Sequence, residues 1–140
     1  MKRIFKADKS ELYNVLTFIE EQASSSVDER LLSKLNLVVE ELFVNVANYA
    51  YKKEGLNVPK DEQIVVIDIY NDTDNKNLII SFEDNGVPFD PLQKKDPNMD
   101  EYIKERRIGG LGIPLVKRMM DKVYYSYEDN KNILVVEKTY

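Results

Sequence analysis

Apolar residues recur at helical spacing after Asp8, where the sequence predicts its first helix. Asp8 and Glu11 have the spacing of a capping box, which supplies hydrogen bonds to the first turn of a helix. The apolar stripe consists of Leu12, Val15, Leu16 and Ile19. The serine run at 24–26 interrupts this pattern, so we expect the helix to end there.

Two further helices are predicted from the same periodicity. The longer one covers about residues 28–51, and Ser26 with Glu29 forms its predicted capping box. The other covers residues 109–121. Pro114 is tolerated in the first turn of that helix, because the N–H groups there have no partner within the helix.

Runs of β-branched and apolar residues predict strands at residues 2–6, 63–70, 77–83, 123–127 and 133–139. Turn-forming residues separate the second strand from the third and the fourth from the fifth, so each pair is predicted to form a hairpin. This order of elements predicts an α+β fold, a two-layer sandwich in which about three helices cover one face of a mixed β-sheet. The length of 140 residues suits a single domain over residues 1–140.

Neither periodicity holds between residues 84 and 108. This segment contains Gly86, prolines at 88, 91 and 97, and many charged residues, so it predicts a long loop. Structureless loops of this length are uncommon in compact domains and are often functional lids. We therefore expect a lid at about residues 87–108.

Composition excludes several classes of chemistry. The chain has no cysteine and no histidine, so disulfides, histidine metal sites, serine–histidine triads and phosphohistidine relays are impossible within it. The net charge of −5 disfavours nonspecific binding to nucleic acid or anionic membranes. The N-terminus lacks the apolar run of a signal peptide, and no stretch is apolar enough for a membrane helix. We expect a cytoplasmic protein.

Glu41, Asn45 and Asn48 form the first candidate site. Spacings of four and three place them on one face of the predicted helix, within an otherwise apolar stretch. Burying an unpaired amide costs about 2–7 kcal/mol, which a Mg²⁺ ion with phosphates above this face would offset. Asn45 offers a hard oxygen ligand, and Glu41 a carboxylate able to accept a proton from a hydroxyl. The alternative is that the helix turns this face to water.

The segment Glu83-Asp84-Asn85-Gly86 follows a predicted strand directly. Asn-Gly usually marks a hairpin turn, but the prolines at 88 and 91 prevent the next residues from returning as a paired strand. A carboxylate beside a glycine at a strand end is able to accept a hydrogen bond from the amino group of a flat heterocycle.

Glycines open the third predicted helix, in the run Gly109-Gly110-Leu111-Gly112. They free backbone N–H groups to point at an anion, and the helix N-terminus adds positive potential. Arg106 and Arg107 precede the run and are able to reach a terminal phosphate. A simple turn and a solvated charge cluster are the ordinary alternatives.

The order of these motifs resembles the ATPase superfamily of gyrase, Hsp-type chaperones, histidine kinases and mismatch-repair proteins, which implies a Bergerat-type ATP-binding fold. Within it, the sequence is most similar to the bacterial anti-sigma-factor serine/threonine kinases, stand-alone histidine-kinase-like ATPase domains. Residues 39–51 resemble their N box, residues 83–90 their first glycine box and residues 109–121 their second.

This resemblance implies a role for each matched residue. Glu41 is the expected catalytic base, Asn45 the Mg²⁺ ligand and Asp84 the adenine reader. The implied nucleotide-binding residues are Asn45, Asn48, Asp84, Gly86, Arg107, Gly109, Gly110, Leu111 and Gly112. The family transfers the γ-phosphate of ATP to a serine or threonine of an antagonist (anti-anti-sigma) protein. It also binds a sigma factor, which regulates transcription, and relatives often dimerise.

Three departures from the family pattern keep an alternative open, and one of them is that residues 52–62 form a longer segment than the family leads us to expect. Tyr49 stands where many relatives carry histidine. The last hairpin lacks the Gly-Thr pair often found near the phosphates, which leaves Asn132 as the residue available to substitute. The alternative function is a nucleotide-switched protein-binding module without kinase activity. A histidine kinase fragment would need a separate phosphoacceptor chain, since this one has no histidine.

Overall fold

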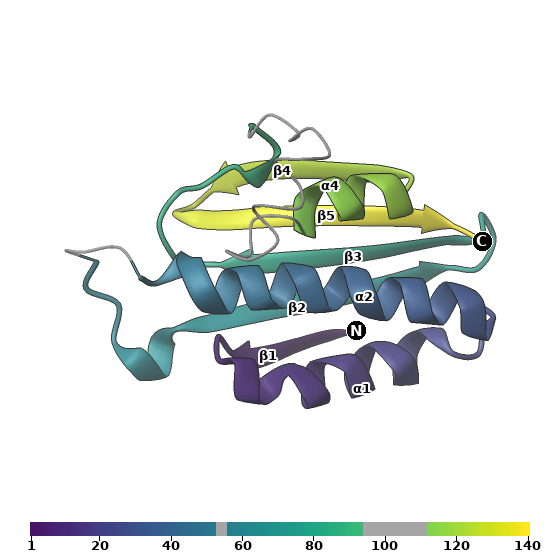
Figure 1. The fold of residues 1–140 in the computed structure, drawn as a ribbon, viewed down its shortest axis with the longest axis horizontal. Coiled ribbons are helices and arrows are strands. Elements are labelled where there is room, and N and C mark those ends of the chain that lie inside the picture. The colour runs from purple at the N-terminus through teal and green to yellow at the C-terminus, as the bar shows by residue number, and fades with distance from the viewer. Residues whose placement is uncertain (53–55, 94–111) are drawn as a thin grey trace, which may run out of the picture.

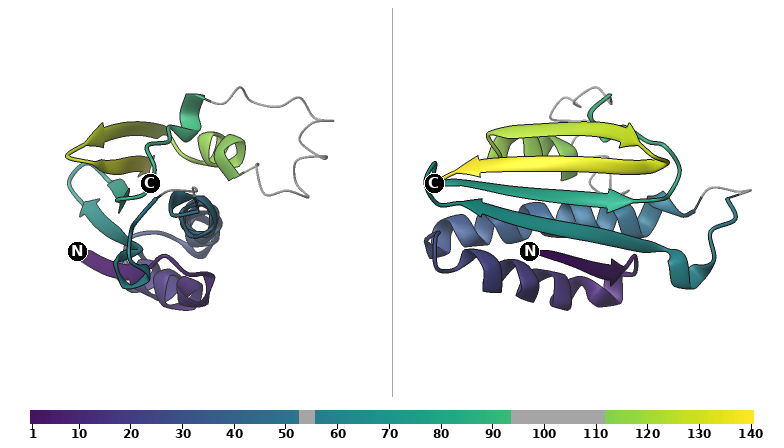
Figure 2. Two further views of the ribbon diagram at one scale, coloured as in Figure 1. Left: turned by 90° about the vertical axis from the view of Figure 1, so that its left-hand side faces the viewer. Right: turned by 180° about the vertical axis from the view of Figure 1, so that it is seen from behind.

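The computed structural model describes residues 1–52, 56–93 and 112–140, and these form two layers. One layer is a five-stranded sheet, and the α-helices of the described residues lie together on one of its faces (Figure 1). The end-on view in Figure 2 separates the two layers, and the view from behind shows the sheet face that these helices leave uncovered. The predicted α+β two-layer architecture is therefore confirmed.

The helices follow the predicted periodicity. Helix α1 covers Leu12–Ala23, after the short 3₁₀ turn η1 at Lys9–Glu11. Helix α2 covers Glu29–Asn45 and continues into a π-helical turn, η2, at Val46–Ala50. Helix α4 covers Gly112–Met119, so it ends two residues earlier than the sequence predicts. Further 3₁₀ turns are η3 at Lys60–Glu62 and η4 at Pro91–Gln93.

The two predicted capping boxes are only partly correct. Asp8 accepts a hydrogen bond from Ser10 N (3.0 Å), but the carboxylate of Glu11 accepts one from Asn14 instead of closing the box. Helix α2 is capped by Asp28, which accepts from Leu31 N at 2.8 Å. The predicted cap residue, Ser26, instead accepts a hydrogen bond from the side chain of Asn71.

The strands agree closely with the predicted runs. They are β1 at Lys2–Lys6, β2 at Ile64–Asp72, β3 at Asn77–Asp84, β4 at Lys122–Glu128 and β5 at Lys131–Thr139. The order across the sheet is β1-β2-β3-β5-β4. Two residues, Asp129 and Asn130, join β4 to β5 with positive φ angles of 53° and 62°, as a tight hairpin turn requires.

The sheet is antiparallel between all neighbouring described strands, so the prediction of a mixed sheet is wrong. The crossover through α4 does bring β3 and β4 into the same direction. However, β5 lies between them and pairs antiparallel with both. The two strands that run in the same direction are therefore not neighbours in the sheet.

The core lies between the helices and the inward face of the sheet. Its largest fully buried side chains include Phe18 of α1, Phe43 of α2 and Phe82 of β3. Among the described residues, the buried polar or charged side chains are Asp84 and Asn132, which face each other across the β3–β5 ladder. The core thus ends in a polar pair where these two strands meet the candidate site.

The predicted lid is described only at its beginning. Residues 87–93 are described, whereas the rest of the predicted lid lies outside the described residues. No helix in the described part of the chain is both long and apolar enough to span a membrane.

Candidate nucleotide site

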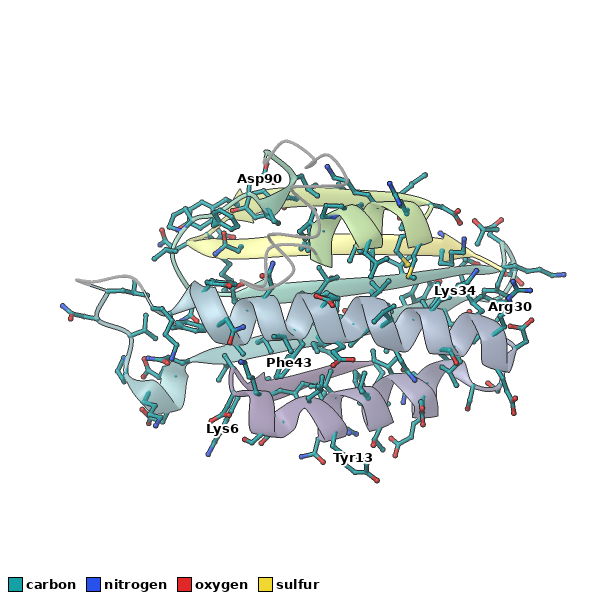
Figure 3. The ribbon with its side chains drawn as sticks, in the orientation of Figure 1. Lys6, Tyr13, Arg30, Lys34, Phe43 and Asp90 are labelled. Carbon is teal, nitrogen blue, oxygen red and sulfur yellow. The ribbon has the colours of Figure 1, made fainter. Side chains whose placement is uncertain are left out.

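Glu41 and Asn45 lie one helical turn apart near the C-terminal end of α2, as the sequence predicts. Both are half-buried, and so is Asn48, which lies in the π turn that continues the helix. Phe43, labelled on α2 in Figure 3, is fully buried in the core, so the same helix has both a core face and a polar face. Single π turns inside α-helices are frequent at functional sites.

Glu41 contacts the N-terminal end of α4. A Cβ atom added at Gly112 would lie 2.8 Å from Glu41 Oε2 and 2.9 Å from Glu41 Cβ. Only glycine allows this approach, which places a carboxylate beside the positive end of a helix. Burial, and then the neighbouring Glu40, raise the pKa of the Glu41 carboxyl above its ordinary value.

Asp84 is the last residue of β3 and is buried. Its Oδ1 accepts hydrogen bonds from Gly86 N (2.9 Å) and from Asn132 Nδ2 (3.0 Å). Burial raises the pKa of the Asp84 carboxyl, and these two hydrogen bonds oppose that rise because they favour the charged form. Both donors among the described residues bond to Oδ1, and none bonds to Oδ2.

Gly86 packs against the backbone of the π turn. A Cβ at this position would lie 2.2 Å from the carbonyl oxygen of Ala50, and the same oxygen accepts a hydrogen bond from Val87 N at 2.9 Å. The resemblance predicts that Gly86 allows adenine to approach. The structure adds a second requirement for glycine, which is contact with Ala50.

Tyr51 is a site residue that the sequence analysis did not identify. It is buried, and its hydroxyl donates to Ile64 O (2.5 Å), lies 2.6 Å from Asn85 Oδ1 and accepts from Asn85 N at 3.3 Å. Burial is the main cause that raises the pKa of Tyr51 to about 12. In the sequence, Tyr51 is only the last residue of a predicted helix, and no local pattern indicates this bridge.

The first motif therefore contacts both of the others. Its helix meets the second glycine box where Glu41 packs on Gly112. Its C-terminal end meets the first glycine box through Ala50 and Tyr51, which contact residues 85–87. Three segments far apart in the sequence are joined at one end of α2.

Four predicted binding residues cannot be placed. Arg107, Gly109, Gly110 and Leu111 lie outside the described residues. Gly112 is described and begins α4 with its contact to Glu41. The predicted phosphate loop is thus represented by its last residue alone.

The described residues can be compared with the donor sets that metal ions and nucleotides need. No group of three or more histidine, cysteine, aspartate or glutamate side chains gathers as a metal site in the described part of the chain. The amide of Asn45 is a hard oxygen ligand, but one amide needs phosphate oxygens or water to complete the coordination of Mg²⁺. The buried acceptor at Asp84 suits a base that carries an amino group.

A family model provides the deciding comparison, because the model of the histidine kinase-like ATPase domain matches residues 5–138. The chain belongs to this family. The match begins near the end of β1, includes all three motifs and ends one residue before the end of β5. It confirms the superfamily resemblance drawn from the motifs.

Curated relatives include two proteins named serine-protein kinase RsbW, from Listeria innocua and Listeria monocytogenes. Each is 29% identical to this histidine kinase-like ATPase domain over 111 residues, which is 76% of this chain. The match covers 65% of each relative's own length, slightly less than two thirds.

Solved structures show the same fold at low identity. A chain in the SiaB–SiaC complex from Pseudomonas aeruginosa matches with a TM-score of 0.60 and 9% identity, covering 99% of this chain and 88% of that one. The histidine kinase domain of a blue-light-activated kinase from Erythrobacter litoralis matches with a TM-score of 0.53 and 14% identity, covering 93% and 59%. At these identities the likeness shows the fold alone.

Proposed function

We propose that this protein is an ATP-dependent serine/threonine protein kinase that phosphorylates an antagonist protein and acts as an anti-sigma factor in the cytoplasm. The observation that carries the proposal is the contact of the Glu41–Asn45 helix with both glycine boxes. In this proposal, the general base Glu41, the metal ligand Asn45 and the adenine-recognising carboxylate of Asp84 lie around one end of α2. The names of the curated relatives support serine as the acceptor.

Each described residue has a chemical role in this proposal. Asp84 Oδ2 accepts a hydrogen bond from the amino group of adenine, because Oδ1 is already occupied. Asn45 and Asn48 face the phosphates, and Asn45 is the protein ligand to Mg²⁺. Bound Mg-ATP supplies the phosphoryl group and the charge that neutralises it. The remaining predicted contacts are Arg107, Gly109, Gly110 and Leu111.

Glu41 accepts the proton of the substrate hydroxyl. Its carboxyl is half-buried and its pKa is raised, which brings it closer to the working pH, where a general base is most effective. Phosphoryl transfer otherwise depends mainly on positioning and electrostatic stabilisation. The absence of histidine from the chain is therefore compatible with this chemistry.

The first experiment is calorimetric titration of Mg-ATP into the wild type and Asp84→Asn. The wild type should bind saturably, and the variant should bind at least about tenfold more weakly, because an amide in place of the carboxylate weakens or misdirects this contact. No saturable binding by a well-folded wild type would refute ATP binding.

The second experiment separates catalysis from binding. Glu41→Gln should bind ATP with nearly wild-type affinity but lose about 100-fold or more of phosphate transfer to the antagonist, a typical loss for a general base. Glu29→Gln is the matched control, since Glu29 is exposed on the same helix and lies about three turns away from Glu41. Equal transfer by Glu41→Gln and the wild type would contradict the kinase assignment.

A nucleotide-switched binding module is the second candidate. The observation that favours it is Asn132, which stands where the wider superfamily often has Gly-Thr and which bonds to Asp84. The protein chain of similar fold in the SiaB–SiaC complex also supports a protein partner. ATP-dependent binding of the antagonist or sigma factor, without transfer, would favour this candidate over the kinase.

A further inference from the structure

Asn132 uses both ends of its side-chain amide. The amide nitrogen Nδ2 donates to Asp84 Oδ1 (3.0 Å) and to Val87 O (2.8 Å). The amide oxygen Oδ1 accepts from Phe89 N (3.1 Å) and from the hydroxyl of Tyr125. An asparagine amide has two N–H donors and two main acceptor positions, so its hydrogen-bonding capacity is fully used.

These four bonds fix the orientation of the amide. A rotation by 180° would turn the oxygen toward two acceptors, Asp84 Oδ1 and Val87 O, and the NH₂ group toward Phe89 N, which can only donate. Asn132 is only 7% exposed, so water cannot easily replace the lost partners. The amide therefore presents an N–H to Asp84 in the folded protein.

The carboxylate of Asp84 is oriented in turn. Oδ1 receives both Asn132 Nδ2 and Gly86 N, which leaves Oδ2 without a donor among the described residues. Exchanging the two oxygens would require both hydrogen bonds to break and form again. Asn132 thus contributes to the choice of the oxygen that faces a ligand.

The same amide holds the start of the segment that follows β3. Val87 O and Phe89 N both bond to Asn132, while Val87 N bonds to Ala50 O. The chain then continues over the end of β4, where Asp90 is labelled in Figure 3. The side chain that orients Asp84 therefore also anchors residues 87–89.

We infer that Asn132 is a positioning residue that holds Asp84 ready to accept a hydrogen bond from the base and couples this carboxylate to residues 87–89. The inference rests on the proposed function in one respect, because the ligand is taken to be a nucleotide. The inference places Asn132 at the end of the site that binds the adenine base, and beside residues 87–89, where the predicted lid begins.

Three variants separate the bonds of this amide. Asn132→Ala removes all four. Asn132→Asp keeps an acceptor for Phe89 and Tyr125, but it replaces the N–H that faces Asp84 with a second carboxylate oxygen. Tyr125→Phe is the matched control, because it removes one bond to Asn132 and leaves the contacts to Asp84, Val87 and Phe89.

In Mg-ATP calorimetry, Asn132→Ala should bind at least about tenfold more weakly, whereas Tyr125→Phe should stay within about threefold of the wild type. Hydrogen exchange of the Phe89 amide in the free protein should accelerate by about tenfold or more in Asn132→Ala. Binding and exchange both unchanged in Asn132→Ala would overturn the inference.

The pH profile of Asn132→Asp distinguishes positioning from simple support of the fold. Two adjacent carboxyl groups share a proton as the pH falls, and the shared proton restores a donor between positions 132 and 84. The Kd ratio of this variant to the wild type should therefore shrink between about pH 8 and pH 5. The other ionisable groups nearby are Glu83, Asp90, Tyr51, Tyr125 and Tyr127.

If the Kd ratio of Asn132→Asp to the wild type stayed constant with pH, the positioning role would be overturned, even if Asn132→Ala did not fold. Should the wild type not bind ATP, the proposed function fails on its own account. The exchange of the Phe89 amide in free Asn132→Asp then decides the inference, because a lost N–H donor must still release Val87 O. Faster exchange than in the wild type supports the coupling, and exchange equal to that of the wild type refutes it.

Discussion

Glu41 and Gly112 pack so closely that position 112 has no room for a side chain. A Cβ there would lie 2.8 Å from the Oε2 atom and 2.9 Å from the Cβ atom of Glu41. The side chain of α2 thereby sets the distance at which α4 begins. This contact holds the N box and the second glycine box together. Substitutions at either residue therefore test the arrangement of the site directly.

Gly112→Ala should destabilise the protein by about 1–3 kcal/mol, the usual cost of overpacking. The sign of this change in stability is informative, because alanine normally stabilises a helix relative to glycine by about 1 kcal/mol. If the contact with Glu41 were absent, the same substitution would stabilise α4. Urea unfolding of the wild type and variant measures the difference, and a more stable variant would contradict the contact.

A double-mutant cycle with Glu41→Ala tests whether Glu41 causes the loss. Removing Oε2 relieves only the contact at 2.8 Å, while the contact with Cβ at 2.9 Å remains. Gly112→Ala should therefore lower the free energy of unfolding less in the Glu41→Ala background than in the wild type, but it should still lower it. Strict additivity would exclude a direct interaction.

Gly86→Ala should be more damaging than Gly112→Ala, with a loss of more than about 3 kcal/mol or failure to fold. The new Cβ would lie 2.2 Å from the carbonyl oxygen of Ala50, a backbone atom held by Val87 N. Backbone cannot move aside as the end of a glutamate side chain can. Thermal unfolding of both variants compares the two losses.

Ala50→Gly provides the control for this position. It removes the Ala50 Cβ that would lie 2.8 Å from the new atom but leaves the carbonyl oxygen in place. Ala50→Gly should therefore fail to rescue Gly86→Ala. Substantial rescue would mean that the side chain, and not the backbone, sets the requirement for glycine.

The sequence predicted the strands well because alternation is a local property. In β3 every second residue from Leu78 to Asp84 is buried, and the predicted hairpin with β2 forms in full register. The antiparallel sheet was not predictable in the same way. It depends on the insertion of β5 between β3 and β4, which is a choice of topology and not of local pattern.

Caps and site contacts were missed for a related reason. Ser26 and Glu29 have the spacing of a capping box, but Ser26 is engaged by Asn71 from a distant strand. Tyr51 ends the N box and Asn132 was only a candidate substitute for Gly-Thr, but no local pattern indicates that both bond to the segment that follows Asp84. Spacing along the chain made Glu41, Asn45 and Asp84 candidates, whereas the contacts that orient Asp84 depend on tertiary structure.

Tyr51→Phe should lower the free energy of unfolding by about 1–2 kcal/mol at neutral pH, because it leaves Ile64 O and Asn85 with fewer partners. The folded pKa of Tyr51 is about 12, above the ordinary value of 10.0. Its hydroxyl therefore contributes fully below pH 10 and loses this contribution as the pH rises toward 12. The gap between wild type and variant should shrink over that window.

Urea unfolding of both proteins at about pH 8 and pH 10.5 measures this gap. The other tyrosines ionise in both proteins, so their effects cancel in the difference. Tyr13→Phe is a suitable control because Tyr13 is 79% exposed. A wild-type advantage that grows in alkali would mean that the hydroxyl does not occupy the buried position described here.

Asp121 gives a pH dependence of the opposite sign. Its carboxylate accepts a hydrogen bond from Thr139 N (2.7 Å) and lies 3.3 Å from Lys138 Nζ, so it fastens the end of β5 beside the start of β4. The hydrogen bond from Thr139 is the main cause that lowers the pKa of Asp121 below 3.8. Its contribution to stability is thus fully present above pH 3.8 and lost as the pH falls through the lower folded value.

Asp121→Asn should cost about 1 kcal/mol at neutral pH, with the ion-pair part reduced by salt because the site is solvent-exposed. Asp61→Asn is the matched control, since it removes the same charge at an exposed position in η3. Unfolding followed from pH 7 to about pH 3 should show the gap between Asp121→Asn and the wild type closing only below pH 3.8. The gap would instead stay constant if the bond to Thr139 did not depend on the charge of the carboxylate. It would close near neutral pH if another group were responsible.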